Sequence, residues 1–233
     1  MVYNDYGTSI PDGQGIVNII KHQCLLNLGH REERSAMSRK YELRRRAERQ
    51  EETRQRIVEA AVHLHQTVGG AKASISAIAE LAGVERLTVY RHFPDERSLA
   101  TACTSHYLAE NPPPDPGSWQ GLADAEQRLR RALKDIYAYH RRTEQMFTHA
   151  ERDMEEVPVL REVLAPYFAY WERVRDMLVS TWETRDAVHC TRLCAAIGHA
   201  ISFQTWRSLV REQGLEDAEA VELMIGMVRC LCR

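Results

Sequence analysis

From residue 57 onward, apolar residues recur at helical spacing over most of the chain. In the first such stretch they fall at i, i+3, i+4, i+7 and i+11, which are Ile57, Ala60, Ala61, Leu64 and Val68. This period predicts an amphipathic helix, and the Gly69-Gly70 pair that follows is a typical helix stop. No stretch alternates apolar and polar residues as a half-buried strand would, so we expect an all-α chain.

Two short helices are predicted between Ser74 and Pro94. Ser74 is placed as the N-cap of the first, whose apolar face ends at Gly83. A turn follows, and the second helix runs over residues 86–92 and closes on Phe93 and Pro94. A helix, a tight turn and a second helix form the layout of a helix-turn-helix, whose second helix can lie in the major groove of DNA.

Further helices are predicted on both sides of a proline-rich break. The break is Asn111-Pro-Pro-Pro-Asp-Pro-Gly117, which cannot continue a helix and reads either as a domain boundary or as a stiff loop between helices. We expect one domain over 38–110 and another over 118–233. The predicted helices outside the helix-turn-helix cover residues 94–110, 122–141, 143–153, 158–182, 187–212 and 217–232.

The first 37 residues are predicted to lie outside the packed domains, and residues 38–55 are predicted to lead into the first helix. Residues 1–37 carry glycines and a proline that interrupt any periodicity, so we expect a disordered or loosely attached tail. A start of translation at Met37 is a hypothesis that this pattern suggests. Residues 38–55 hold seven Lys+Arg and four Asp+Glu. They read either as a solvated helix with i,i+4 ion pairs or as a basic arm that follows phosphates.

Composition narrows the class of protein. With 44% hydrophobic and 27% charged residues in 233, and no apolar run of the roughly 18 residues that span a bilayer, we expect a cytoplasmic protein with no membrane partner. The six cysteines are too scattered for a disulfide scaffold.

The net charge is −2, yet residues 38–106 hold twelve Lys+Arg against nine Asp+Glu, a local excess that suits phosphate contact. Because no enzyme motif is present, we expect no catalysis, no cofactor and no metal.

The helix-turn-helix carries a family resemblance. Ile78-Ala-Glu-Leu-Ala-Gly-Val84 followed by Leu87-Thr-Val-Tyr-Arg-His-Phe-Pro94 resembles the DNA-binding domain of the TetR family of bacterial transcriptional regulators, over roughly residues 50 to 105. The resemblance implies an N-terminal three-helix helix-turn-helix DNA-binding domain and, beyond Pro112, a helical ligand-binding and dimerisation domain. Family members dimerise through their last two long helices.

The expected DNA contacts lie on the second helix and at the start of the first. Arg86 suits a bidentate contact to guanine, Thr88 an edge contact to a base, and Tyr90 and His92 suit phosphate oxygens. The resemblance also implies contacts at neighbouring positions, and the full set is Ser74, Ser76, Arg86, Leu87, Thr88, Tyr90, Arg91 and His92. Two positions depart from the family pattern: Leu87 replaces a common small residue, and Glu96 stands where a basic residue is frequent.

Aromatic and apolar residues in the second half are candidates for an effector site. A small-molecule site needs a mostly apolar, concave lining with a few polar groups. The candidates are Met146, Phe147, Tyr167, Trp171, Phe203 and Trp206, each of which could instead belong to the core, with His140, His149 and His199 as scattered polar groups. Cys190 and Cys194 lie one helical turn apart and read either as small hydrophobes or as a thiol or soft-metal sensor.

Together these features predict a homodimeric transcriptional regulator, most simply a repressor, that binds a palindromic DNA operator and is released by a small-molecule effector. We expect the last two helices to form a dimeric four-helix bundle that buries Ile197, Ile201, Val221, Met224, Ile225 and Val228. The alternative is a helical ligand- or partner-binding module with weakened DNA binding, which Glu96 and the net acidity favour.

Overall fold

The computed structural model describes the backbone of residues 2–3, 9–10 and 13–231, and the side chains of residue 37 and of residues 40–231. The chain divides into two compact units, Met1–Gln55 and Arg56–Arg233. In the first unit, strands β1 (Val2–Tyr3) and β2 (Ser9–Ile10) pair antiparallel, which the sequence pattern did not predict. The helix α1 (Gly13–Thr67) begins there, so part of the expected tail has helical backbone. Whether that tail is loosely attached stays a prediction.

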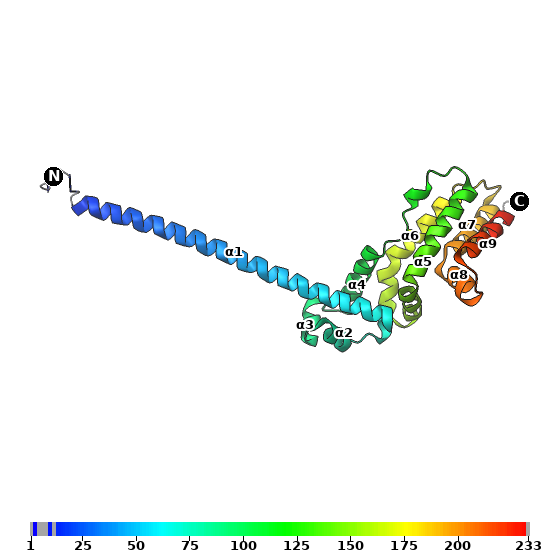
Figure 1. The fold of residues 1–233 in the computed structure, drawn as a ribbon, viewed down its shortest axis with the longest axis horizontal. Coiled ribbons are helices and arrows are strands. Elements are labelled where there is room, and N and C mark those ends of the chain that lie inside the picture. The colour runs from blue at the N-terminus through cyan, green and yellow to red at the C-terminus, as the bar shows by residue number, and fades with distance from the viewer. Residues whose placement is uncertain (1, 4–8, 11–12, 232–233) are drawn as a thin grey trace. The chain divides into compact units, whose positions relative to one another are not determined.

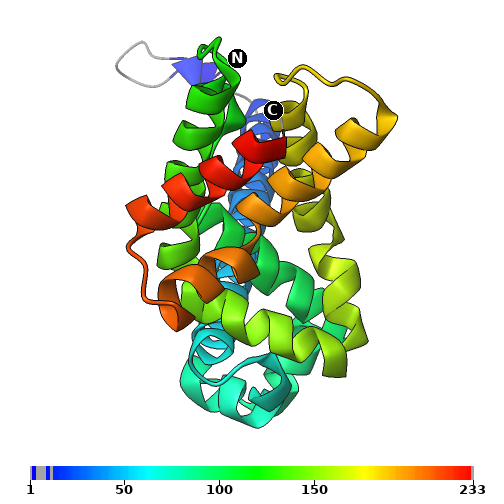
Figure 2. The ribbon, with the colours of Figure 1, turned by 90° about the vertical axis from the view of Figure 1, so that its right-hand side faces the viewer.

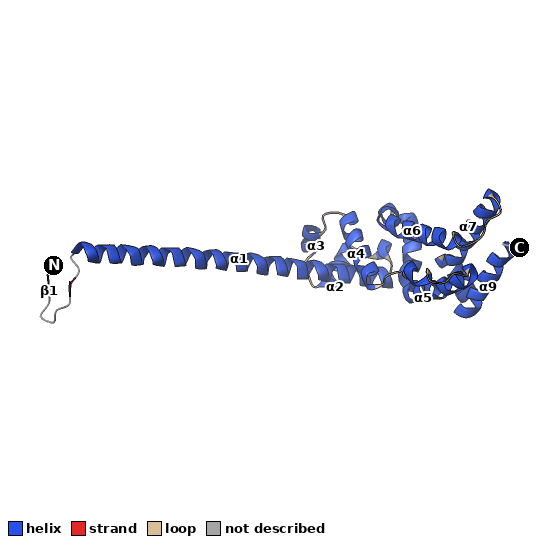
Figure 3. Cartoon of the chain, turned by 90° about the horizontal axis from the view of Figure 1, so that it is seen from above, coloured by secondary structure: helices blue, strands red, loops and turns tan. Residues whose placement is uncertain are grey.

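The second unit is built of helices, as predicted. After α1 come η1 (Gly70–Lys72), α2 (Ile75–Ala82), α3 (Arg86–His92) and α4 (Glu96–Glu110). A second group follows after the proline segment; its elements are η2 (Pro116–Trp119), α5 (Ala125–Glu156), α6 (Pro158–Val179), α7 (Ala187–Ile201), α8 (Phe203–Arg207), η3 (Ser208–Glu212) and α9 (Asp217–Leu231). Figure 1 shows α5 beside α6, and Figure 3 separates the α2–α4 group from the α5–α9 group.

Residues 56–110 form what we call the head. Its core contains Ile57, Ala61, Ile78, Val89, Phe93 and Leu99, none more than 6% exposed. Ser74 caps α2 by accepting a hydrogen bond from the Ala77 N–H at 3.1 Å, and Gly83 ends α2 at φ +65°, both as predicted. Arg56 donates to the carbonyl of Ala82 at 3.0 Å and so ties α1 to the last turn of α2.

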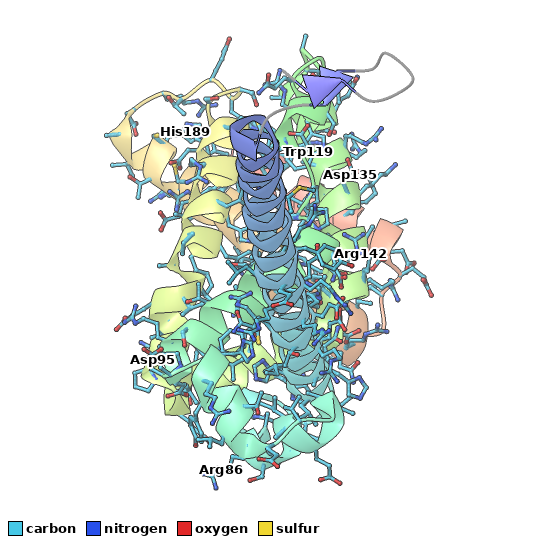
Figure 4. All side chains as sticks on the ribbon, turned by 90° about the vertical axis from the view of Figure 1, so that its left-hand side faces the viewer. Arg86, Asp95, Trp119, Asp135, Arg142 and His189 are labelled. Atoms are coloured by element: carbon cyan, nitrogen blue, oxygen red, sulfur yellow. The ribbon has the colours of Figure 1, made fainter. Side chains whose placement is uncertain are left out.

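Elements α5 to α9 form what we call the bundle, and the proline segment is a loop within the same compact unit as both groups. The division into domains 38–110 and 118–233 therefore stays a prediction. The bundle core includes Leu129, Leu133, Ile136, Leu178, Leu193 and Trp206, which are fully buried. Trp119, in η2, closes one end of this core and donates its indole N–H to Asp135 at 2.8 Å (Figure 4).

Helix α5 is continuous, whereas the sequence pattern predicted two helices over its length. The predicted break was wrong because two polar residues, His140 and Thr143, occupy buried positions on the apolar face of the helix and interrupt the apolar pattern. Thr143 donates to the carbonyl of Tyr139 at 2.8 Å, which satisfies its hydroxyl inside the helix. No glycine or proline interrupts residues 125–156, so nothing in the backbone ends the helix at residue 142.

The predicted helix 187–212 is instead broken at Ser202. Ser202 has extended backbone, and its hydroxyl accepts a hydrogen bond from the Thr205 N–H at 3.2 Å as the N-cap of α8. The carbonyls released at the end of α7 find partners on α5. Tyr137 donates to Ala200 at 3.0 Å, and His140 Nε2 lies 3.0 Å from the Ile201 oxygen. These contacts stabilise the break.

A charged network fixes α9 to α5. Arg229 donates to Glu126 at 2.7 Å, and Arg130 contacts both Glu126 at 2.9 Å and Glu222 at 2.7 Å. The hydrogen bonds from Arg229 and Arg130 lower the pKa of Glu126 from 4.5 to about 2. Because the folded pKa lies below the ordinary value, the network stabilises the fold above about pH 4.5 and loses this contribution as the pH falls toward 2.

We therefore expect the stability difference between the native chain and Glu126→Gln to shrink on acidification. Urea unfolding at pH 6 and at pH 3 measures it. Glu183→Gln, which removes an exposed carboxylate from the loop between α6 and α7, is the control. A difference that is the same at both pH values would contradict the assignment.

Candidate nucleic-acid interface and ligand cavity

Helix α3 presents the predicted DNA-reading side chains to solvent. Val89 and Phe93 anchor it in the head core, at 0% and 3% exposure. The opposite side carries Arg86, Leu87, Tyr90 and Arg91, which are exposed, while Thr88 and His92 are partly exposed. Figure 4 shows Arg86 pointing away from the ribbon, at the end of the unit opposite to His189. The structure thus places six of the eight predicted residues on α3, and four of these six are exposed.

Arg86 and Tyr90 are not independent of each other. An Nη2 hydrogen of Arg86 is donated to the Tyr90 hydroxyl at 3.1 Å, and the guanidinium carbon lies 5.6 Å from the ring centroid. The pair is spaced i,i+4 on the helix, so the two side chains share one face. Tyr90 therefore orients the arginine, in addition to the phosphate contact that we predict for it.

The start of α2 supplies the other predicted contacts. Ser74 and Ser76 are exposed there. Because the Ser74 oxygen accepts the Ala77 N–H, the hydroxyl hydrogen stays available for donation to a phosphate oxygen. Leu81 was not predicted from the sequence; it is 51% exposed on the same helix.

The start of α4 carries the departure from the family pattern. Glu96 lies in the first turn of α4, where a negative charge is favoured by the helix dipole. The neighbouring Arg97 forms an ion pair with Glu162 of α6 instead of replacing a basic residue at position 96. The head, residues 56–110, has five Lys+Arg and six Asp+Glu, so the basic excess counted from the sequence lies in residues 38–55.

A cavity of about 310 Å³ lies between α5, α6 and the break at Ser202; we call it the bundle cavity. Four of the six predicted ligand residues line it: Phe147, Tyr167, Trp171 and Phe203. Phe147 and Tyr167 are stacked with centroids 4.9 Å apart, and Trp171 meets Tyr167 edge to face at 5.9 Å. The structure therefore gathers these rings from α5, α6 and α8 into one wall.

The other two predicted residues lie elsewhere. Met146 lines a smaller cavity of about 60 Å³ between the head and the bundle, which shares Phe147, Ala150 and Leu164 with the first. Trp206 is fully buried behind Phe203 and donates its indole N–H to Asp217 at 2.9 Å. It packs in the bundle core and does not line the bundle cavity.

The charged lining of the bundle cavity was missed from the sequence. Glu151 and Arg175 line it together with Glu172, Ser202 and Gln204. Glu151 lies four residues after Phe147, and Arg175 lies four residues after Trp171, so each shares a helix face with a predicted aromatic residue. Residues one helical turn after Phe147 and Trp171 on the same faces could therefore have been predicted as lining residues from the sequence.

His140 is the buried polar group of the bundle cavity. It is 2% exposed, and since a carbonyl oxygen only accepts, its Nε2 carries the proton toward Ile201. Nδ1 has no hydrogen-bond partner among the described residues. Burial lowers the pKa of His140 to about 4, so the ring is neutral near pH 7.

The end of α5 grips the loop that leads into the helix-turn-helix. Asp153, 1% exposed, accepts the Ala71 N–H at 3.1 Å and pairs with Arg152 at 2.8 Å. Arg152 also donates to the Val68 carbonyl at 3.3 Å. Gly69 has φ +91°, and a Cβ there would lie 2.8 Å from Asp153 Oδ2, so a side chain would strain this grip. We call these contacts the loop latch.

The described residues hold no group of three or more His, Cys, Asp or Glu placed to bind a metal. Cys190 and Cys194 are both partly buried on α7. Burial, together with the adjacent Cys190, raises the pKa of Cys194, which disfavours the thiolate that metal binding or oxidation requires. Within the described part of the chain, no helix is both long and apolar enough to cross a bilayer.

Known proteins resemble this chain both in the helix-turn-helix and in the fold. Residues 57–103 match the family described as bacterial regulatory proteins, tetR family. A search of curated proteins found no match. Similar solved structures include a linker-substituted variant of HlyIIR, with TM-score 0.54 and 18% identity over 76% of this chain and 95% of that one.

Two further structures have the same fold. A TetR-like transcriptional regulator from Rhodococcus sp. RHA1 has TM-score 0.51 and 18% identity, over 76% of this chain and 93% of that one. A regulator from Saccharomonospora viridis in complex with choline has TM-score 0.54 and 20% identity, over 77% and 96%. Residues 57–103 thus match the tetR family of bacterial regulatory proteins, and these solved structures share the fold of the chain beyond the matched residues.

Proposed function

We propose that the chain is a transcriptional repressor that binds a palindromic operator as a homodimer and is released by a small-molecule effector. The observation that carries the proposal is the exposed side of α3, where Arg86, Leu87, Tyr90 and Arg91 stand clear of the head core. Donors near the start of a recognition helix suit base edges, and those further along suit phosphates.

The dimer surface differs from the one expected from the sequence. Ile197, Ile201, Val221, Met224, Ile225 and Val228 are at most 4% exposed within a single chain, so they pack α7 and α9 inside the protomer. The expectation that they meet a second copy was wrong, because apolar periodicity alone does not distinguish internal packing from an interface. Helices α7 and α9 nevertheless lie side by side on the face turned to the viewer in Figure 2.

Helices α7 and α9 also carry exposed apolar side chains. Val188 is 61%, Leu223 44% and Met227 51% exposed, and Ala195 is also exposed. Gly226 leaves open space beside Met227. We assign these residues to the dimer interface, because burying such a patch against its two-fold copy removes apolar area from water.

Met227→Glu should therefore shift the protein from dimer to monomer at micromolar concentration, since it would place two charges in the interface. Light scattering after size exclusion measures the mass. Leu81→Glu, an equally exposed leucine on α2, is the matched control and should leave the mass unchanged. If Met227→Glu remains a dimer, the interface does not include this patch of α7 and α9.

Effector release is supported by how the bundle cavity is connected to the head. Helix α5 lines the cavity with Phe147, Ala150 and Glu151, and two residues later it holds the loop latch through Asp153. A ligand that favours one position of this helix end would shift the helix-turn-helix, provided that it binds the two states with different affinity. The choline complex of the similar regulator supports a small molecule as the effector.

Selection from fragmented genomic DNA of the source organism tests the proposal. The full chain should retain specific fragments, and footprints should show two symmetric half-sites about one helical turn apart or a multiple of it. A purified chain that retains no specific fragment at low salt would overturn the repressor assignment.

The second candidate is a helical ligand- or partner-binding module with weakened DNA binding. Glu96 and the excess of acidic over basic residues within the head favour it. The two candidates differ in salt dependence. A repressor keeps a specific site as salt rises, whereas a module with weakened DNA binding retains at most non-specific affinity.

A further inference from the structure

The bundle cavity adjoins an outer pocket that is rich in carboxylates, and we call the two pockets together the path. The outer pocket shares Glu151, Met154, Phe168, Glu172 and Gln204 with the bundle cavity. It adds Glu155 and Arg161 to the charged groups along this path. Three glutamates, Glu151, Glu155 and Glu172, therefore line the path.

The two arginines of the path have hydrogen-bond or ion-pair partners, whereas the carboxylate of Glu151 has no close cation in the part of the chain that the structure describes. Arg175, on the cavity wall, pairs with Asp176 at 2.8 Å, and Arg161 donates to the Met154 carbonyl at 3.3 Å. Glu151 is partly buried and accepts only a neutral donor among the described side chains, the Gln204 amide at 2.7 Å. Arg207 acts on it only at longer range.

Two further observations favour a positive ligand. Burial raises the pKa of Glu151, and the attraction of Arg207 and the bond from Gln204 only partly offset this effect, as expected for a carboxylate without a close cation. His140 is neutral and so adds no positive charge, while its unpartnered Nδ1 is an acceptor. A desolvated carboxylate is costly without a counter-charge, and a bound cation would supply one.

The aromatic wall suits the same kind of ligand. Phe147, Tyr167 and Trp171 of this wall and the adjacent Phe168 lie next to one another, with ring centroids of neighbouring pairs 4.9 to 5.9 Å apart. Ring faces attract cations through their quadrupole and bury apolar groups equally well. Apolar molecules without charge would gain only the second of these contributions.

We propose that the effector is an organic cation with an apolar body, held by Glu151 and the aromatic wall of the bundle cavity. The inference rests on the proposed effector function and names the class of molecule that the cavity takes. The Glu151 carboxylate neutralises the ligand charge, Trp171 and Tyr167 cover its apolar body, and Glu155 and Glu172 attract it at the entrance.

Phenyltrimethylammonium and tert-butylbenzene test the charge directly, because the two have nearly the same shape and differ by one positive charge. Calorimetric titration of the full chain, without DNA, should give a dissociation constant about tenfold or more lower for the cation. Glu151→Gln should remove most of that difference and leave the affinity for tert-butylbenzene unchanged. Glu156→Gln, an exposed neutralisation at the end of the same helix, should preserve the difference.

Equal affinity for the two probes, or no binding of either, would overturn the proposed ligand class. A preference for the cation that survives in Glu151→Gln would overturn the role of this carboxylate. These outcomes are distinguishable from failure of the repressor assignment, since the titration contains no operator. Circular dichroism melting of each variant confirms that the compared proteins are folded.

Discussion

Replacing Arg86 with Ala should remove discrimination at one base pair of each operator half-site, at a cost of about 1–3 kcal/mol for the preferred base. The reason is that Arg86 stands in the first turn of α3, exposed and oriented by Tyr90 at 3.1 Å. Affinities for the operator and for all single-base variants of one half-site, measured by fluorescence anisotropy, give the discrimination position by position.

Two other variants complete this test. Tyr90→Phe keeps the ring under the guanidinium but removes the hydroxyl, so we expect weaker binding to every sequence together with a partial loss at the Arg86 position. Arg131→Ala removes one positive charge from α5, outside the head, and should leave the base preferences unchanged. If Arg86→Ala lowers the affinity for every variant by the same factor, Arg86 contacts phosphate and does not read a base.

Replacing Asp153 with Ala should break the loop latch, which has the second large expected effect. The substitution leaves the Ala71 N–H without its buried acceptor and Arg152 without its carboxylate, so we expect a loss of about 1–3 kcal/mol in the free energy of unfolding. Effector titrations should then release the operator less completely, because the cavity would no longer act on the loop before α2. Urea unfolding and effector-dependent anisotropy measure the two effects separately.

The conservative variant Asp153→Asn separates the effect on the free energy of unfolding from the effect on effector release. Asp153→Asn keeps an oxygen acceptor for Ala71 and loses the charge toward Arg152, so it should recover much of the stability lost in the alanine variant. Glu156→Ala removes a carboxylate from the same helix end, where it is exposed, and should change neither quantity. An effector response in Asp153→Ala equal to that of the native chain would exclude the latch as the route of coupling.

The sequence predicted the head well because its information is local. Ser74 as N-cap, Gly83 at positive φ, and the burial of Val89 and Phe93 each follow from neighbouring residues, and the structure confirms all of them. The resemblance to the TetR family, based on the same residues, is also confirmed. The DNA contacts themselves remain predictions, supported by the exposure of the side chains on α3.

The bundle was harder to predict because its decisive contacts are long-range. The break at Ser202 depends on Tyr137 and His140, which lie more than sixty residues earlier and accommodate the end of α7. The direction in which α9 buries its apolar residues likewise depends on α5, so periodicity alone could not separate the core from the dimer face. Glu151 was overlooked because a single charge on an apolar helix reads as a solvated position until the cavity beside it is known.

Operator affinity across a salt series tests the central claim most directly. A fragment selected from genomic DNA and the same fragment with its half-sites scrambled are titrated with the full chain, from about 0.05 to 0.3 M salt. A repressor that reads bases through α3 should bind the selected fragment about 10³-fold more tightly than the scrambled one, and the preference should persist as both affinities fall. Equal affinity for the two fragments at every salt concentration would contradict it.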